Sequence, residues 1–106
     1  MDKQQTIVSP PPTSENVLQT LREYPNLFEK FHIKTLALFG SIANDCATAE
    51  SDLDFLVEFS TETTLSLYMD LKFFLEEIFN KPVDLVTKKS LKEIIREQVL
   101  SEAKYV

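Results

Sequence analysis

The apolar residues of the chain follow two different periods, and each period predicts one type of element. Helical spacing predicts an amphipathic helix that opens at Ser14 as its N-cap and ends before Pro25, and a longer helix over residues 63–80. A third helix is predicted to open at Ser90, with Glu93 completing a capping box. Each of these helices has one apolar face that should turn toward a core.

Three shorter segments have the apolar content of strands. Ile33–Phe39 is a nearly continuous apolar run, Leu53–Phe59 alternates, and residues 83–86 have the sequence Val-Asp-Leu-Val. Because a strand, the 63–80 helix and another strand follow one another, we expect these two strands to be parallel with a right-handed crossover. We therefore predict an α/β (α+β) fold, with a small mixed sheet of about three strands covered by helices.

The length of the chain predicts one domain with a short N-terminal segment. Its 106 residues amount to a single domain of common size. Residues 1–14 are largely polar and contain three consecutive prolines, so we expect a flexible lead-in there and the folded domain over residues 15–106. Apolar runs are far shorter than the roughly 20 residues of a membrane-spanning helix, and a signal-peptide core is lacking. We expect a cytoplasmic protein without a membrane partner.

The scarcity of three residue types excludes several kinds of site. The single glycine, Gly40, cannot form a multi-glycine phosphate loop or a dinucleotide-binding fingerprint. One cysteine, Cys46, and one histidine, His32, cannot supply a Cys/His zinc site or an internal disulfide. A formal net charge of −6 argues against direct binding of nucleic acid. Any chemistry must therefore use carboxylates, hydroxyls, lysines and arginines.

Acidic residues lie on two of the predicted strands. Asp52 directly precedes the second strand and is two residues from Asp54 on it, so their side chains project from the same face. Asp84 lies on the third strand and reaches the same side if the two strands are neighbours. Adjacent carboxylates repel each other unless a cation neutralises them, and Mg²⁺ takes oxygen ligands together with substrate phosphates. The sequence therefore predicts a site for one or two metal ions formed by these three carboxylates.

Gly40 and Ser41 directly follow the first strand and suit the binding of a phosphate. A residue without Cβ lets the backbone turn and approach a phosphate closely, while the Ser41 hydroxyl and the following amides can donate hydrogen bonds. Bound phosphates beside metal-binding carboxylates indicate phosphoryl or nucleotidyl transfer. Lys88 and Lys89, just beyond the third strand, could add positive charge to this site, although a solvated start of the last helix is the simpler interpretation.

Most of the chain resembles a known family, the minimal nucleotidyltransferase (MNT) domain antitoxins of the DNA polymerase β-like superfamily. The resemblance covers about residues 15–106 and is carried by LALFGSIANDCATAESDLDFLVEF, residues 36–59, and by KPVDLVT after it. The family motif of Gly-Ser, ten residues and Asp-x-Asp matches Gly40, Ser41, Asp52 and Asp54, and the third carboxylate of the family falls on Asp84.

The resemblance implies an enzyme that uses ATP and Mg²⁺, transfers AMP to a hydroxyl and releases pyrophosphate. In the toxin–antitoxin pairs of this family, the acceptor is a tyrosine of a HEPN-domain ribonuclease toxin, which the antitoxin binds as a hetero-oligomer. On this basis Asp52 and Asp54 hold the metal ions, while Asp84 completes the metal site and positions or deprotonates the acceptor hydroxyl. Gly40 and Ser41 hold the outer phosphates of ATP.

The chain departs from the family pattern after the Gly-Ser pair. Where members often have Arg and Gly, this chain has Ile42, Asn44 and Asp45, and a carboxylate there would repel a triphosphate. The alternative function is therefore an antitoxin that keeps the fold but neutralises its toxin by binding alone. Transfer of AMP to a small molecule is a third option, which the absence of a second domain in this sequence disfavours.

Aromatic residues on the 63–80 helix predict a further buried surface. Tyr68 and Phe74 have the spacing of core residues, whereas Phe73 and Phe79 widen the apolar stripe beyond one core face. A protein partner would account for the wider stripe.

Overall fold

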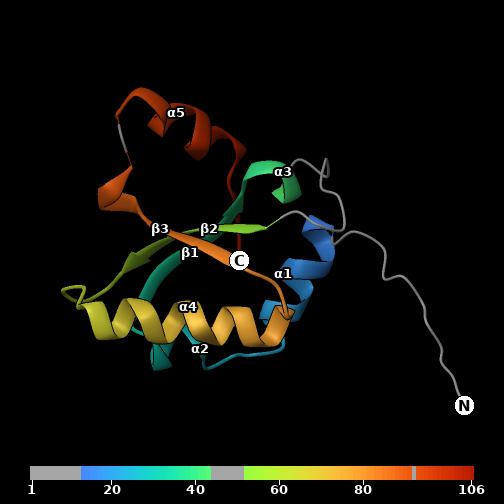
Figure 1. Ribbon diagram of the computed structural model, residues 1–106, viewed down its shortest axis with the longest axis vertical. Coiled ribbons are helices and arrows are strands. Elements are labelled where there is room, and N and C mark those ends of the chain that lie inside the picture. The colour runs from blue at the N-terminus through green and yellow to red at the C-terminus, as the bar shows by residue number, and fades with distance from the viewer. Residues whose placement is uncertain (1–12, 44–51, 92) are drawn as a thin grey trace, which may run out of the picture.

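In the computed structural model, which describes residues 13–43, 52–91 and 93–106, a four-stranded mixed sheet lies between two layers of helices (Figure 1). The elements in chain order are α1 (Ser14–Arg22), α2 (Leu27–Lys30), β1 (Ile33–Phe39), α3 (Gly40–Ala43), β2 (Leu53–Phe59), α4 (Leu65–Phe79), β3 (Val83–Thr87), the 3-10 helix η1 (Lys88–Ser90), α5 (Glu93–Glu102) and β4 (Lys104–Tyr105). The predicted α/β fold is confirmed. Among these residues no helix has the length and apolar content that a membrane span requires.

The sheet has the strand order β3-β2-β1-β4. β2 and β3 are parallel and are connected by α4, whereas β1 is antiparallel to both of its neighbours, β2 and β4. The predicted parallel pair and the mixed sheet are therefore confirmed. This order brings the beginnings of β2 and β3 together and places them beside the end of β1.

The alternation of side chains along β2 divides the core into two clusters. Leu53, Phe55 and Val57 are buried with residues of α1, α2 and α4 on one face of the sheet. Leu56 points to the other face, where it packs with Ala37 of β1 and with residues of α5. Figure 1 shows α3 and α5 on this second face and α4 on the first. Because both faces are covered, three consecutive residues are buried in the middle of each central strand, 36–38 in β1 and 55–57 in β2.

Two of the predicted helix caps are wrong. The N-cap of α1 is Thr13, whose hydroxyl accepts an N–H bond of 3.1 Å within the first turn, so Ser14 is the first helical residue and not the cap. The last helix begins at Glu93, and Ser90 instead ends η1. The Ser90 hydroxyl is hydrogen-bonded to the Thr87 hydroxyl at 2.6 Å. This local bond offers Ser90 a partner other than a helix N-terminus.

The C-terminal end adds a strand that the hydrophobic pattern does not reveal. α5 ends at Glu102, and a single residue, Ala103, separates it from β4. β4 pairs with β1, and the N–H of Val106 donates to the Leu36 carbonyl at 2.9 Å. A strand of two residues is too short to show alternation, and its pairing depends on contacts that are distant in sequence. The four-residue helices α2 and α3 were likewise too short to be predicted.

Candidate functional site

The three predicted metal ligands gather at one end of the sheet. Asp54 of β2 and Asp84 of β3 are register partners in the parallel pair. Asp52 directly precedes β2 and is exposed. On its other side Asp54 is the register partner of Phe39, the last residue of β1. The second and third strands are thus neighbours, which is the condition under which Asp84 was predicted to join the other two carboxylates.

Asp54 and Asp84 project from the face of the sheet that α5 covers. Along β2, Asp54 is in phase with Leu56, which is buried in the cluster beneath α5. Along β3, Asp84 is in phase with Val86, which packs against the same cluster. Asp54 is half-buried and Asp84 is exposed. The two carboxylates therefore form the open border of an apolar layer.

Gly40 is fixed both by its backbone and by its contact with Asp54. Its φ of +79° lies in the left-handed region that favours glycine. A Cβ placed on Gly40 would collide with the carboxylate oxygen Oδ2 of Asp54. The sequence predicts a tight turn at Gly40, and the structure adds this close packing against a predicted metal ligand. Any larger residue would strain the backbone and displace the carboxylate.

The environment of Asp54 disfavours its negative charge. Burial raises the pKa of this carboxyl from 3.8, and the carboxylates of Asp84 and Asp52 raise it further, to about 6. No ion pair to Asp54 is found in the described part of the chain. A bound cation would offset both effects, so the charge and the oxygen donors fit a divalent metal such as Mg²⁺.

The three predicted carboxylates do not form a ready-made metal site. Within residues 13–43, 52–91 and 93–106, no three aspartate, glutamate, histidine or cysteine side chains converge closely enough to hold a metal ion. Metal binding at Asp52, Asp54 and Asp84 would therefore require their side chains to turn toward a common centre. The register supports this for Asp54 and Asp84, which are direct partners on adjacent strands.

Part of the predicted phosphate-binding segment lies outside the described residues. Ser41 follows Gly40 within α3. Asn44, Asp45 and Cys46 lie in the segment 44–51, which the structure does not describe. The effect of the missing family arginine therefore stays a prediction.

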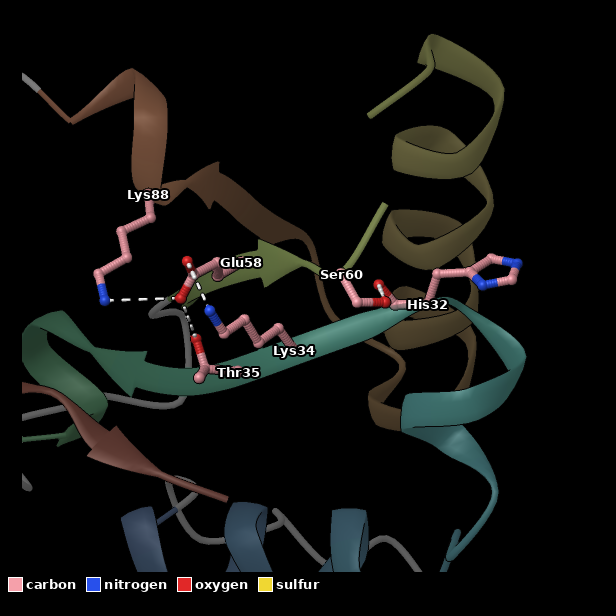
Figure 2. A network of polar contacts seen from close by, with 6 residues as sticks. All are labelled: His32, Lys34, Thr35, Glu58, Ser60 and Lys88. Carbon is pink, nitrogen blue, oxygen red and sulfur yellow. Dashed lines mark hydrogen bonds and ion pairs between the residues drawn. The ribbon is translucent and has the colours of Figure 1, made fainter. Parts of the chain in front are cut away.

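The opposite end of the same sheet face carries a cluster of ion pairs around Glu58. Its carboxylate accepts the Thr35 hydroxyl at 3.4 Å and pairs with the ammonium groups of Lys34 at 3.9 Å and Lys88 at 3.6 Å (Figure 2). Lys88 lies four residues beyond Asp84, which at the rise of a strand is about 13 Å. The suggestion that Lys88 adds charge to the predicted phosphate site is therefore wrong, because its ammonium is engaged at the far end.

A hollow of about 910 Å³ lies at the end of the sheet that carries Glu58. The ends of β2 and β3, residues 61–64, the first turn of α4 and Arg96 of α5 line it. None of the three predicted metal ligands borders the hollow. The candidate site is instead the open surface at the other end of the sheet, in keeping with a chain too small to enclose a deep chamber.

Two side chains of α4 contact the strand that carries Asp84, and the sequence did not single them out for this role. The Tyr68 hydroxyl donates to the Leu85 carbonyl at 2.6 Å. The Val83 N–H donates to Oε2 of Glu76 at 3.0 Å. Tyr68 has the spacing of a core residue, and Glu76 has the composition of an ordinary helix surface. The one available signal is that the two residues lie about two helical turns apart.

The two aromatic residues predicted at a partner surface differ in their surroundings. Phe79 packs on the core, with 6.0 Å between its ring centroid and that of Phe55, so its assignment to a second surface is wrong. Phe73 is 57% exposed and borders a shallow hollow together with Phe74 and Lys30. Phe73 is thus available for contact with a partner.

Known proteins resemble this chain in sequence and in fold. The family model described as nucleotidyltransferase domain matches residues 7–106. The protein adenylyltransferase MntA of Thermococcus cleftensis is 39% identical over 80 residues, which are 76% of this chain and 81% of the relative. A solved structure described as a minimal nucleotidyltransferase superposes with a TM-score of 0.75 at 34% identity, over 87% of this chain and 94% of the other.

A more distant structure contains two proteins. It is described as the tri-AMPylated HEPN toxin of Shewanella oneidensis in complex with an MNT antitoxin. The matching chain superposes with a TM-score of 0.61 at 20% identity, over 84% of this chain and 70% of that one. At this identity the likeness is evidence for the fold alone.

Proposed function

Since the chain belongs to the nucleotidyltransferase-domain family, we propose that it is a Mg²⁺-dependent protein adenylyltransferase that moves AMP from ATP to a tyrosine hydroxyl of a HEPN-domain toxin. In this role it is the antitoxin of a cytoplasmic toxin–antitoxin pair. The name of the Thermococcus relative supports transfer of adenylyl groups to protein. The choice of partner follows the complex of an AMPylated HEPN toxin with an MNT antitoxin, one chain of which has the same fold as this protein.

The observation that carries the proposal is the placement of the acidic residues. Asp54 and Asp84 are register partners on adjacent parallel strands, and the charges of Asp84 and Asp52 add to burial in raising the pKa of Asp54. Such an arrangement costs stability when no cation is bound. The same carboxylates can bind a divalent cation that arrives with a nucleoside triphosphate, which explains why the protein has this arrangement.

Each predicted site residue has a role in this reaction. Asp52 and Asp54 would hold the metal, with Asp84 completing the ligand set, and Gly40 and Ser41 would contact the outer phosphates. Mg²⁺ bound there would neutralise charge on the transferring and leaving groups. The acceptor oxygen forms a bond to the α-phosphorus, the bond from that phosphorus to the bridging oxygen of the β-phosphate breaks, and pyrophosphate leaves. Asp84 would position the acceptor hydroxyl or take its proton.

An antitoxin that acts by binding alone is the second candidate. Asp45 favours it, because this residue brings negative charge to a segment where the family often has an arginine. The half-buried Asp54 favours transfer, because a protein that only binds gains nothing from a carboxylate whose charge is disfavoured. The two candidates therefore differ in whether the carboxylates are needed.

The deciding experiment combines the protein with ATP labelled at the α-phosphate, Mg²⁺ and a HEPN-domain protein encoded beside it. Label on the HEPN protein that disappears in the Asp52→Asn, Asp54→Asn double variant supports transfer by this site. Glu97→Gln, which removes the charge of an exposed carboxylate on α5, is the control and should transfer normally. Tight binding and a silenced toxin without any label would refute transfer and favour the binding-only function.

A further inference from the structure

We infer that Tyr68 and Glu76 are positioning residues that hold the backbone on both sides of Asp84, so that its carboxylate stands beside that of Asp54. Neither side chain is expected to touch metal or nucleotide. The inference rests on the proposed metal site and extends it to the helix behind the strand.

The orientation of the peptide groups along β3 follows from the sheet. β3 is an edge strand whose neighbour is β2, and in a parallel pair the residues that bond to the neighbour alternate along the strand. The Leu53 N–H donates to the Pro82 carbonyl at 3.2 Å. Pro82 and Asp84 therefore direct their peptide groups toward β2, whereas Val83 and Leu85 direct theirs to the outer edge.

Both outward residues are held by α4. The Glu76 carboxylate accepts the Val83 N–H at 3.0 Å, and the Tyr68 hydroxyl donates to the Leu85 carbonyl at 2.6 Å. The first bond is assisted by charge, and the second is at the short end of the range for hydroxyl donors. The backbone around Asp84 is thus fixed from the sheet on one side and from the helix on the other.

The two hydrogen bonds from α4 have a purpose because the carboxylates of Asp54 and Asp84 repel each other. Like charges placed directly opposite across two strands destabilise their pairing. β3 is an edge strand, so within the described part of the chain it is paired with β2 alone and has no other strand to hold it in place. Without the bonds from α4, β3 could yield to this repulsion and carry Asp84 away from Asp54. A rival explanation is that the same bonds only cover the outer edge against pairing with another chain.

Three variants at the helix separate these explanations through binding of Mn²⁺, measured by calorimetry with a non-hydrolysable ATP analogue. Glu76→Ala removes the acceptor and should weaken Mn²⁺ binding about tenfold, the lower end of the effect of outer-shell partners. Glu76→Gln keeps an oxygen acceptor and should restore most of the affinity. Glu77→Ala, a change at the exposed next residue, should bind like wild type. Equal losses in Glu76→Ala and Glu76→Gln would overturn the inference, because charge and not the hydrogen bond would then matter.

A further pair of variants tests the tyrosine through the Mg²⁺ dependence of label transfer. Tyr68→Phe removes only the hydroxyl and should raise the Mg²⁺ concentration at half-maximal rate severalfold, with less effect on the rate at saturating Mg²⁺. Tyr24→Phe is the control, because Tyr24 is an exposed tyrosine whose ring makes a T-shaped contact with Phe74.

Folding of every variant is checked by circular dichroism, so that weak binding is not confused with unfolding. Folded Glu76→Ala and Tyr68→Phe proteins that bind metal like wild type would overturn the inference and leave the edge-covering role. Asp84→Asn distinguishes failure of the proposed metal site. If that variant also binds Mn²⁺ like wild type, Asp84 is not a ligand, which refutes both its place in the proposed metal site and the positioning role of Tyr68 and Glu76.

Discussion

Replacement of Asp54 by asparagine should stabilise the metal-free protein at neutral pH while it abolishes transfer. Burial and two neighbouring carboxylates raise the pKa of Asp54 from 3.8 to about 6, so the folded state holds this proton more tightly than the unfolded chain does. The resulting stabilisation is complete below about pH 4 and is lost as the pH rises through about 6. Asparagine is neutral throughout this range and escapes the loss.

The size of the effect follows from the pKa. The difference between 3.8 and about 6, at about 1.36 kcal/mol per pH unit, sets a ceiling of about 3 kcal/mol. Because Asp54 is only half-buried, solvent screening should reduce this to about 1.5 kcal/mol. Asparagine has nearly the same shape, so the packing against Gly40 is kept. For a domain of this size the Tm at pH 7.5 should rise by at least about 5 °C.

Urea unfolding followed by circular dichroism, in the presence of a chelator at pH 4 and pH 7.5, measures the difference. The free energy of unfolding of Asp54→Asn relative to wild type should increase by about 1.5 kcal/mol between the two pH values. Asp70→Asn, at an exposed position on α4, should show no such increase. A variant that is less stable than wild type at pH 7.5, or a difference that does not change with pH, would refute the argument that the negative charge of Asp54 destabilises the metal-free protein.

Three further predictions concern other parts of the molecule. Gly40→Ala should lower label transfer at least about tenfold and cost about 1–3 kcal/mol in urea unfolding, because the added Cβ strains a positive φ and collides with Asp54. Lys88→Ala should leave the KM for ATP unchanged in the transfer assay, because this lysine pairs with Glu58 at the far end of the sheet. Phe73→Ser should change the free energy of unfolding by less than about 0.5 kcal/mol, because this side chain is exposed. The same variant should co-purify less well with the HEPN partner, and unchanged co-purification would show that Phe73 is not part of the interface.

The strands were the most predictable elements, because their patterns reflect burial on the sheet. β1 and β2 have the bounds that their apolar content predicts, Ile33–Phe39 and Leu53–Phe59. α4 occupies Leu65–Phe79 within the predicted 63–80, and it ends where Asn80 adopts a left-handed φ of 52°. In these segments the local pattern and the tertiary contacts favour the same structure.

The errors occur where contacts distant in sequence decide the outcome. Ser90 and Glu93 form a plausible capping box in sequence, but the Thr87 hydroxyl binds Ser90 and the helix starts later. β4 exists because β1 offers an open edge, and a pairing of two residues leaves no periodic signal. Helix caps and short edge strands therefore need the tertiary structure before they can be assigned.

The candidate site was predictable in part. Side-chain alternation places Asp52 and Asp54 on one face, and the strand–helix–strand unit makes Asp84 a neighbour. The collision between a Cβ at position 40 and Asp54 depends on the register of β1 against β2, which the sequence does not specify. Even so, the metal-binding and phosphate-binding roles of these residues stay predictions until transfer is measured.

The two ends of the sheet face under α5 differ in whether the protein compensates the charge of the acidic residues there. At one end Glu58 has the ammonium groups of Lys34 and Lys88 within 4 Å, so its charge is balanced by the protein itself. At the other end Asp54 has two carboxylates for neighbours and, within the described residues, no cationic side chain paired to it. Because the fold can balance a carboxylate when stability alone is at stake, the unbalanced end is best explained by a cation that arrives with the substrate.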